Sequence, residues 1–343
     1  MVKAKLEFGI VGLGRMGGNL SLHALENGIR VVGFTRGGVP ADLVRAGVVA
    51  IRSLRGFRTR LSPPRAVFLY IPAGPAVDQV LDELASHLEP GDIVVDGGNS
   101  YWGDSIRRAQ RLKARGLDFV DLGTSGGVEG ARQGACFMAG GERQAIERIE
   151  PILRTLAIAG GYVHAGGPGA GHFTKLVHNG IEFGMLQAIS EGVDLLEHYR
   201  DRLKIVDILR CWRHGSVIRS WLIDLMEESY RAEGGLEKIP PYVEDTGEVN
   251  WLVSDALRME VPVPVIAQAV MQLFVSRDDQ KLWARAIAMM RHGFGGHPYG
   301  PSEPIRWERQ GGRINEFPQD ERKPAGGKPP QVHRRQRRVR SHA

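Results

Sequence analysis

Residues 8–17 of this chain read FGIVGLGRMG, an apolar run that leads into three glycines at the spacing Gly-x-Gly-x-x-Gly. This spacing predicts a strand, a sharp turn and then a helix. The first glycine permits the turn, the second lets a ligand approach the backbone, and the third lets the helix pack on the strand. The unpaired N–H groups at the start of the helix suit the charge of a pyrophosphate. The stretch therefore predicts a dinucleotide site formed by Gly12, Leu13, Gly14, Arg15, Met16 and Gly17.

The end of the second expected strand indicates which dinucleotide is used. NAD enzymes usually have a carboxylate there, which accepts hydrogen bonds from the ribose hydroxyls. This chain instead has Thr35 and Arg36 after Phe34. A hydroxyl and a guanidinium can hold a 2′-phosphate. We therefore predict NADP as the cofactor, with NAD as the alternative.

Strand and helix signals divide the chain into three parts. In residues 1–167, short apolar runs alternate with helical patterns, which is typical of a mainly parallel sheet covered by helices on both faces. The expected strands are residues 6–11, 29–34, 66–71, 92–96, 119–122 and 137–139. Residues 168–300 have no strand signal, and the expected helices are 170–199, 204–232 and 264–291. The predicted fold is an α/β Rossmann-type N-terminal domain plus an all-α C-terminal domain.

Composition limits the class of protein. Of the 343 residues, 42% are hydrophobic and 24% are charged, as in ordinary globular proteins. No apolar run is long enough for a membrane span. The two cysteines, Cys136 and Cys211, suit a reducing compartment and have no metal-ligand spacing. We expect a cytoplasmic protein without a metal.

The positive charge of the chain is concentrated at its C-terminal end. Residues 322–343 contain eight lysines and arginines and no acidic residue. Subtracting these eight charges from the formal net charge of +6 leaves −2 for residues 1–321. We expect residues 301–343 to form a basic, disordered tail. A non-enzymatic nucleotide-binding or nucleic-acid-associated protein is the alternative, but residues 322–343 contain no aromatic residue for base stacking, which argues against nucleic acid.

Three segments carry candidate catalytic chemistry. In residues 169–184, Lys175, His178, Asn179 and Glu182 have the spacing of one helix face. A lysine and a glutamate in reach of each other can act as base and acid in one reaction. Residues 96–100 and 123–132 each follow an expected strand, where such sheets bind ligands. The second of these segments offers backbone N–H groups and a hydroxyl that suit a carboxylate.

These motifs together resemble those of the 6-phosphogluconate dehydrogenases, within the β-hydroxyacid dehydrogenase superfamily. The matching segments are residues 12–17, 96–100, 123–132 and 169–184. Residues 211–221 and 291–297 are similar to the short bacterial branch of the family. The resemblance extends over about residues 6–300.

The resemblance implies oxidative decarboxylation of a sugar acid. Lys175, neutral in the substrate complex, takes the proton of the 3-hydroxyl, and hydride leaves C3 for the cofactor. The 3-keto acid then loses CO2, with Lys175 stabilising the enolate oxygen. Glu182, held protonated, then protonates C1 of the resulting enediol and gives a ketopentose. His178 and Asn179 orient the substrate hydroxyls.

The same resemblance assigns the remaining contacts and an assembly. Ser125, Gly126 and Gly127 bind the C1 carboxylate, and Asn99 lies between cofactor and sugar. Arg291 and His297 reach into the site of a neighbouring subunit. The expected protein is a homodimer or homotetramer in the pentose phosphate pathway.

The chain departs from the family where the substrate phosphate is held. A tyrosine position reads Phe183, a lysine and a threonine around Trp251 read Asn250 and Leu252, and a later arginine reads Leu273. Each lost charged hydrogen bond costs about 1.5–3 kcal/mol. One expectation is therefore a non-phosphorylated or sulfonated aldonate. If the phosphate is kept, other donors such as Arg219 or Arg277 must hold it.

A second enzyme class is a 3-hydroxyacid dehydrogenase that does not decarboxylate. Those relatives share a helix lysine followed four residues later by an asparagine, as in Lys175 and Asn179. They lack the acid three residues further on, so Glu182 counts against this alternative. Release of CO2 distinguishes the two classes.

Overall fold

The computed structural model describes residues 6–304 and 306. The chain forms two compact units. The first lies within Met1–Glu191 and Leu236–Arg277, and the second lies within Gly192–Gly235 and Asp278–Ala343. The expected basic tail, residues 301–343, falls almost entirely outside the described residues.

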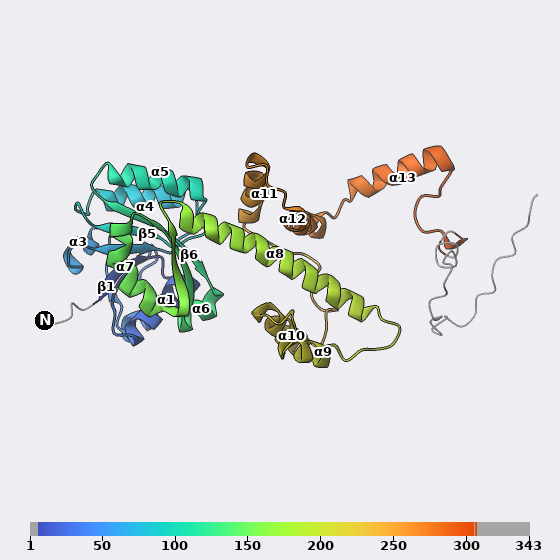
Figure 1. The fold of residues 1–343 in the computed structure, drawn as a ribbon, viewed down its shortest axis with the longest axis horizontal. Coiled ribbons are helices and arrows are strands. Elements are labelled where there is room, and N and C mark those ends of the chain that lie inside the picture. Colours follow the sequence, from blue (N-terminus) through green and yellow to red (C-terminus); the bar gives the residue numbers. More distant parts are fainter. Residues whose placement is uncertain (1–5, 305, 307–343) are drawn as a thin grey trace, which may run out of the picture. The chain divides into compact units, whose positions relative to one another are not determined.

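One eight-stranded sheet forms the centre of the first unit (Figure 1). Its order is β3-β2-β1-β4-β5-β6-β7-β8, and each neighbouring pair is parallel except β6 with β7. The strands are β1 (Glu7–Val11), β2 (Arg30–Phe34), β3 (Val49–Ala50), β4 (Ala66–Leu69), β5 (Ile93–Asp96), β6 (Asp118–Ser125), β7 (Ala135–Gly141) and β8 (Ala157–Gly166). The order reverses between β1 and β4, which is where such sheets open a crevice for a ligand.

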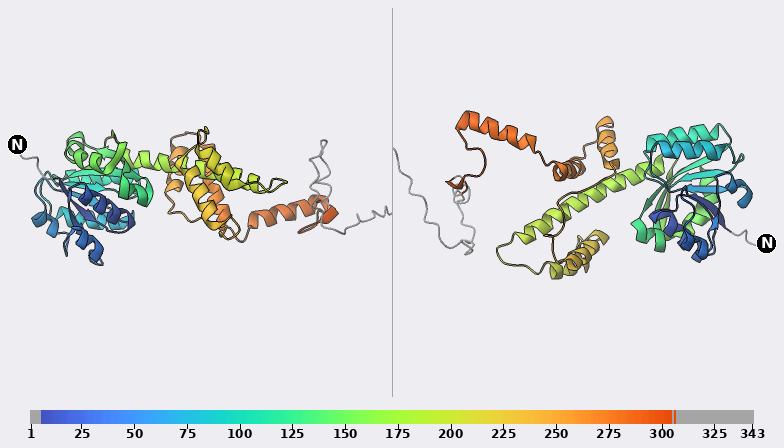
Figure 2. Two further views of the ribbon diagram at one scale, coloured as in Figure 1. Left: turned by 90° about the horizontal axis from the view of Figure 1, so that it is seen from below. Right: turned by 180° about the vertical axis from the view of Figure 1, so that it is seen from behind.

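Helices cover both faces of the sheet, as Figures 1 and 2 show. On one face, α1 (Arg15–Glu26) and α7 (Arg143–Leu156) bury Leu20 and Ile149 against Phe8 of β1. The other face is covered by α3 (Gly56–Arg60), α4 (Pro75–Ala85) and α5 (Trp102–Lys113), which bury Leu81 and Leu112. Two short helices, α2 (Ala41–Ala46) and α6 (Gly127–Gln133), complete this part. The predicted α/β Rossmann-type class is confirmed.

The residues after Pro168 are helical, as predicted, but they form more helices than expected. The helices are α8 (Ala170–Glu197), α9 (Ile205–Arg213), α10 (Trp221–Glu233), α11 (Glu248–Arg258), α12 (Pro264–Arg277) and α13 (Leu282–Gly295). The expected helix 204–232 is two helices, because the chain turns at Gly215, whose φ is 78°, and Ser220 then caps α10. The expected helix 264–291 also breaks, since Lys281 has a φ of 46° and its N–H donates to Asp278 at 2.9 Å.

Three elements were not expected from the sequence. β3 has two residues, too few for a periodic signal. β8 is largely exposed and begins Ala157-Ile158-Ala159-Gly160-Gly161, which has little of the apolar alternation of a strand. α11 follows a segment rich in proline and acidic residues, and contacts with distant residues hold it in place. Within the described residues, no helix has the length and apolar character needed to cross a membrane.

Candidate active site

The glycines at the end of β1 form a cradle that only glycine fits. Gly12 has a φ of 93°, and a Cβ on it would lie 2.3 Å from the carbonyl oxygen of Tyr70. A Cβ on Gly17 would lie 2.0 Å from the carbonyl oxygen of Gly12. Gly14, by contrast, is exposed, has open space around it and precedes the first residue of α1. This open helix N-terminus fits a dinucleotide pyrophosphate.

The other predicted cofactor residues surround this cradle in different ways. Arg15 is exposed and Met16 is half-buried. Leu13 is buried in the core, so only its backbone faces the cradle. The N–H of Gly12 donates to the carbonyl of Phe34 at 2.9 Å, so the ends of β1 and β2 are adjacent. Thr35 and Arg36, the latter exposed, follow at the same edge of the sheet. No carboxylate follows β2 directly.

A buried carboxylate fixes the start of α8 on the sheet. Asp121, fully buried on β6, accepts hydrogen bonds from the backbone N–H groups of Gly169 at 2.7 Å and His172 at 2.8 Å. Burial raises the pKa of Asp121, and its interactions with His172 oppose that rise. A Cβ on Gly171 would lie 2.3 Å from the carbonyl oxygen of Asp121, so the helix sits directly on the strand.

The four polar residues of α8 lie on one face. Lys175 is buried, and its Nζ donates to Asn179 Oδ1 at 2.6 Å and lies 3.4 Å from His178 Nδ1. Glu182 Oε2 is 3.8 Å from His178 Nδ1. A 3.0 Å hydrogen bond joins His178 Nε2 to Ser125 Oγ, at the end of β6. The structure thus brings the predicted lysine, histidine, amide, acid and serine together.

The environment of Lys175 favours its neutral form. Burial lowers the pKa of Lys175 below the ordinary lysine value, and the carboxylates of Glu182 and Glu248 oppose this shift. A lysine with a lowered pKa can accept a proton near neutral pH. Next to Ser125, Gly126 and Gly127 have φ values of 109° and 60° and begin α6.

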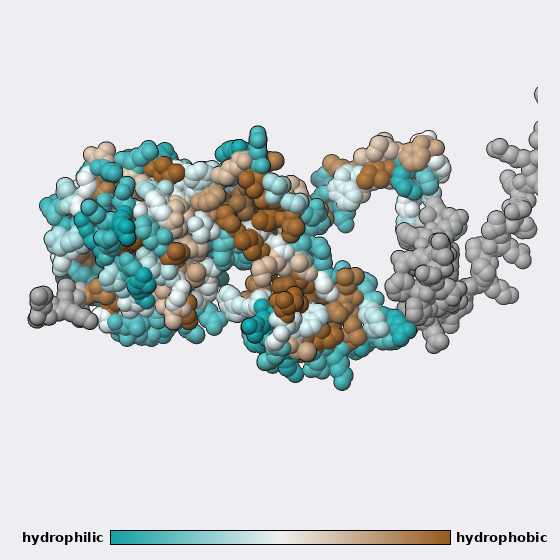
Figure 3. All heavy atoms as spheres, viewed as in Figure 1, coloured by the Kyte–Doolittle hydropathy of each residue, from teal (hydrophilic) through white to brown (hydrophobic). Residues whose placement is uncertain are grey.

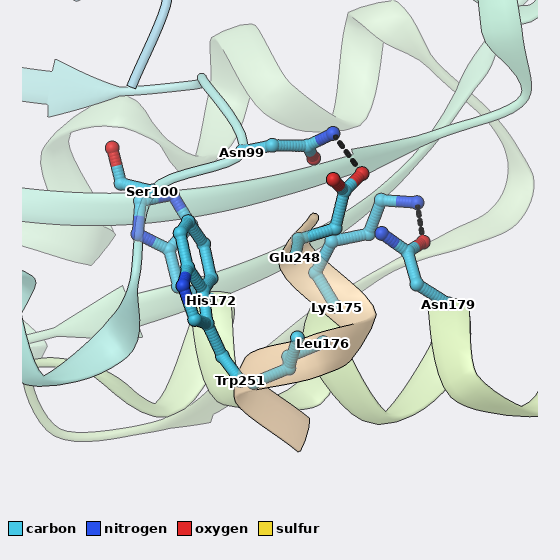
Figure 4. A pocket seen from close by; sticks show the side chains of 8 residues that line it. All are labelled: Asn99, Ser100, His172, Lys175, Leu176, Asn179, Glu248 and Trp251. Carbon is cyan, nitrogen blue, oxygen red and sulfur yellow. Dashed lines mark hydrogen bonds between the residues drawn. The ribbon is translucent and has the colours of Figure 1, made fainter. Parts of the chain in front are cut away.

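A small pocket opens beside Lys175 (Figure 4). Its lining residues are Asn99, Ser100, His172, Lys175, Leu176, Asn179, Glu248 and Trp251. Of these, the sequence predicted Asn99, Lys175 and Asn179 as site residues. Trp251 was noted only as a neighbour of altered positions, and Glu248 was not considered, because α11 was not expected.

His172 is a second lining residue without a predicted role. It is 2% exposed, and its Nδ1 is hydrogen-bonded to Ser105 Oγ at 2.7 Å. Its buried Nε2 has no hydrogen-bond partner among the described residues. Because His172 precedes Lys175 by three residues, the helical period was a signal that it lies on the same helix face as Lys175.

Contacts with the segment after β5 fix α11 over this cavity. Asp255 accepts hydrogen bonds from Tyr101 Oη at 3.0 Å and from Trp102 Nε1 at 2.7 Å. The ring of Trp251 lies edge-on to Tyr101, with centroids 5.6 Å apart. Asn99 Nδ2 donates to Glu248 Oε1 at 3.3 Å.

The positions that depart from the phosphate-binding pattern lie mainly in apolar surroundings. Phe183 packs against a buried cluster of Val249, Val270 and Leu273. Leu252 is 6% exposed, and its Cδ2 is so close to α8 that a Cβ on Gly180 would lie 2.1 Å from it. Asn250 is exposed.

The remaining predicted substrate residues belong to the second unit. Arg291 is exposed on α13, and the carbonyl of His297 accepts a 2.8 Å hydrogen bond from the His292 ring. For a metal, the described residues offer no cluster of three or more histidine, cysteine, aspartate or glutamate side chains.

Two family models match the chain in succession. The NAD binding domain of 6-phosphogluconate dehydrogenase matches residues 7–166, and the C-terminal domain of 6-phosphogluconate dehydrogenase matches residues 171–299. Together they cover most of the chain and both candidate sites.

Individual relatives agree with these models. An NAD(+)-dependent, decarboxylating 6-phosphogluconate dehydrogenase of Haloferax volcanii is 39% identical over 85% of this chain and 98% of its own length. The decarboxylating enzyme of Schizosaccharomyces pombe is 38% identical over 78% of this chain and 58% of its own length. The Plasmodium falciparum 6-phosphogluconate dehydrogenase, solved in its apo form and with NADP+ and 6-phosphogluconate, matches with a TM-score of 0.73 and 28% identity. That match covers 88% of this chain and 68% of the solved one.

Proposed function

We propose that this site carries out the chemistry of the 6-phosphogluconate dehydrogenase family, to which the chain belongs. The chain is an NAD(P)-dependent decarboxylating dehydrogenase, which converts 6-phosphogluconate or a closely related aldonate to a ketopentose and CO2. The roles that we propose for individual residues rest on one observation. Lys175 is buried, Asn179 and His178 lie at its amine, and Glu182 lies on the same helix face.

In the oxidation step, the neutral amine of Lys175 accepts the proton of the C3 hydroxyl. Bound NAD(P) supplies the acceptor for the hydride that leaves C3. Asn179 forms a hydrogen bond with the substrate hydroxyl beside Lys175. His178, which Ser125 orients, forms a hydrogen bond with the next hydroxyl along the sugar acid. Ser125 and the N–H groups of Gly126 and Gly127 bind the C1 carboxylate, since small residues leave these donors open.

In the second step, the C1–C2 bond of the 3-keto acid breaks and CO2 leaves. The electron pair moves toward the C3 carbonyl, where the ammonium of Lys175 stabilises the developing oxyanion and returns a proton. Glu182, acting as the acid, then donates a proton to the enediol carbon that was C2 of the sugar acid, and this carbon becomes C1 of the ketose. Base and acid thus come from residues seven positions apart on α8.

For the cofactor, Gly12, Gly14 and Gly17 with the start of α1 hold the pyrophosphate, and Arg15 and Met16 flank it. Thr35 and Arg36 would hold a 2′-phosphate, so we propose a preference for NADP, with NAD as the alternative cofactor. Residues 1–167 would then bind the dinucleotide, and residues 168–300 would bind the sugar acid and mediate oligomerisation.

An assay panel tests the function. Purified protein is given 6-phosphogluconate, gluconate or sulfogluconate with either NADP or NAD, and both cofactor reduction and CO2 release are followed. We expect equal amounts of reduced cofactor and CO2 from one sugar acid, with higher kcat/KM for NADP. Cofactor reduction without CO2 would indicate a simple 3-hydroxyacid dehydrogenase, and higher kcat/KM for NAD would contradict the role of Arg36.

A second candidate substrate is a non-phosphorylated or sulfonated aldonate. Phe183, Leu252 and Leu273 contribute apolar packing at family positions for phosphate binding, which supports this candidate. Arg277, considered as a replacement cation, is paired with Asp245 at 2.8 Å and Glu244 at 3.3 Å. In the same panel, 6-phosphogluconate as the preferred substrate would contradict this candidate.

We also propose a homodimer or homotetramer in the cytoplasm. α13 has no buried residue among those described, and it exposes Trp283, Ile287, Met289, Met290 and Phe294. Hydrophobic residues are visible on the surface of this helix in Figure 3. A helix that exposes so much apolar surface is expected to pack on another chain. Arg291 lies on this helix, so a second copy would place it at a neighbouring site. The free thiols of Cys136 and Cys211 agree with a reducing compartment.

A further inference from the structure

Glu248, the first residue of α11, presents a carboxylate to the catalytic cavity. Oε1 accepts the hydrogen bond of Asn99 Nδ2 at 3.3 Å, and Thr246 Oγ1 donates to Oε2. Figure 4 shows the carboxylate pointing toward Asn99, on the side of the cavity where the Lys175 amine also lies. Glu248 is half-buried. A carboxylate held by two partners inside a cavity differs from a solvated surface charge.

The position of Glu248 is fixed by the rest of its helix. Asp255 follows Glu248 by seven residues and so lies on the same face of α11. Its hydrogen bonds to Tyr101 and Trp102 attach α11 to the segment that carries Asn99. Trp251, one turn after Glu248, lies beside Tyr101. Three successive turns of α11 therefore contact one short loop, which keeps Glu248 beside the catalytic lysine.

The chemistry of a carboxylate limits what Glu248 can bind. An ionised carboxylate accepts hydrogen bonds and cannot donate them, so it binds hydroxyls and repels anionic groups. Asn99 and Thr246 use only part of its acceptor capacity. The reacting carbon must lie near Lys175 in the proposed reaction. Glu248 lines the same pocket as Lys175 and Asn179, so its carboxylate is available to hydroxyls on the neighbouring carbons.

We propose that Glu248 determines substrate specificity by accepting hydrogen bonds from the hydroxyl groups of the sugar acid. It selects a polyhydroxylated acid over a short 3-hydroxy acid that lacks neighbouring hydroxyls. It also fixes the amide of Asn99, whose Nδ2 points to Glu248 and whose Oδ1 stays available for a ligand. This inference rests on the proposed function and adds a recognition residue to it.

Glu248 has a second effect that distinguishes it from a structural residue. Lys175 is surrounded by His178 and Glu182 of α8, Glu248 of α11 and Cys136 of β7. The charge of Glu248 favours the ammonium form, which raises the pKa of Lys175 against the effect of burial. Removing that charge lowers the pKa of Lys175 further, so the base stays active at lower pH.

Two variants and a control test the proposal. Glu248→Gln keeps the shape and removes the charge, and Glu248→Ala removes both. Glu237→Gln changes an exposed glutamate outside the cavity. KM, kcat and the pH dependence of kcat/KM are measured with the sugar acid turned over by the unaltered protein and with 3-hydroxypropionate. Melting temperatures show whether each variant is folded.

We expect Glu248→Ala to raise KM for the sugar acid about ten- to hundredfold, the size of one lost charged hydrogen bond, and to leave kinetics with 3-hydroxypropionate nearly unchanged. Glu248→Gln should raise KM less and move the acidic limb of kcat/KM to lower pH. Glu237→Gln should change neither.

Two results would overturn the proposal separately. Suppose that the unaltered protein is active and the Glu248 variants fold. If these variants keep the KM and the pH profile of the unaltered protein, or lose catalytic efficiency equally with both substrates, Glu248 has only a structural role. If the unaltered protein reduces no cofactor with any sugar acid, the proposed function fails and the role of Glu248 fails with it.

Discussion

At the scale of the residue, Lys175 shows how burial and nearby charges adjust the lysine that we propose as the base. Burial disfavours the ammonium and lowers the pKa, and the carboxylates of Glu182 and Glu248 raise it. The net shift is downward, so desolvation outweighs the two carboxylates. Asn179 accepts a hydrogen bond from the amine at 2.6 Å and sets its direction. The amine is thus oriented and shifted toward its neutral form, which is the form that can accept a proton.

Replacing Lys175 with methionine should lower kcat about 10²- to 10⁴-fold, because the proposed general base is lost. The matched control is Lys113→Met, an exposed lysine on α5. In the unaltered protein, kcat/KM should fall as pH drops through the pKa of Lys175, since only the neutral amine accepts the proton. The midpoint should lie below the ordinary lysine pKa of about 10.4.

Initial rates of cofactor reduction across pH measure both effects. A Lys175→Met protein with full activity would remove Lys175 from the mechanism. A midpoint at the ordinary lysine value would mean that burial does not lower its pKa.

At the scale of the element, the site depends on how two helices are attached to the sheet. Asp121 holds the first turn of α8, and Asp255 holds α11 on the segment after β5. Both carboxylates are buried and accept two hydrogen bonds each. Such groups stabilise a specific arrangement, because any other one leaves a buried charge without donors.

Asp255→Ala should destabilise the protein by about 1–3 kcal/mol, because Tyr101 and Trp102 lose their acceptor. The melting temperature should fall by several degrees. KM for the sugar acid should also rise, since α11 carries Glu248. Thermal denaturation and steady-state kinetics measure the two effects.

The control is Asp279→Ala, which changes an exposed aspartate. An unchanged melting temperature and KM in Asp255→Ala would show that this contact does not position α11.

At the scale of the whole molecule, the second unit carries an exposed apolar helix together with Arg291 and His297. The large apolar residues of α13 are between 46% and 77% exposed. Most oligomers of one chain are symmetric, so a copy that lends its α13 would receive the same helix in return. Each active site would then contain residues from two subunits.

Mixed oligomers test this arrangement. Lys175→Met and Arg291→Ala should each be nearly inactive alone. Co-expressed in one cell, they should regain about a quarter of normal activity, because half of the dimers are mixed and one of the two sites in each has both residues. Activity assays and light scattering measure the outcome.

A monomer with full activity, or co-expressed variants no more active than their separate sum, would contradict a shared site.

Features that depend on near neighbours in the chain were predictable. The order of residues 8–17 predicted β1, the turn and α1, because glycine is required where a Cβ would strike the backbone. The spacing of Lys175, His178, Asn179 and Glu182 predicted one shared helix face, because the helical repeat is set by backbone geometry alone. The breaks at Gly215 and Lys281 were missed, since apolar periodicity continues on both sides of each.

The sequence by itself therefore determined the fold class and the side chains that α8 presents together. Only the tertiary structure decided what faces them. Asn99 and Glu248 are 149 positions apart, and Trp102 and Asp255 are 153 apart. No local pattern links such residues, because their contact depends on the path of the whole chain and on burial that makes an unpaired carboxylate costly. For the same reason, the packing of Phe183 against Leu273 emerged only once α8 and α12 were in place.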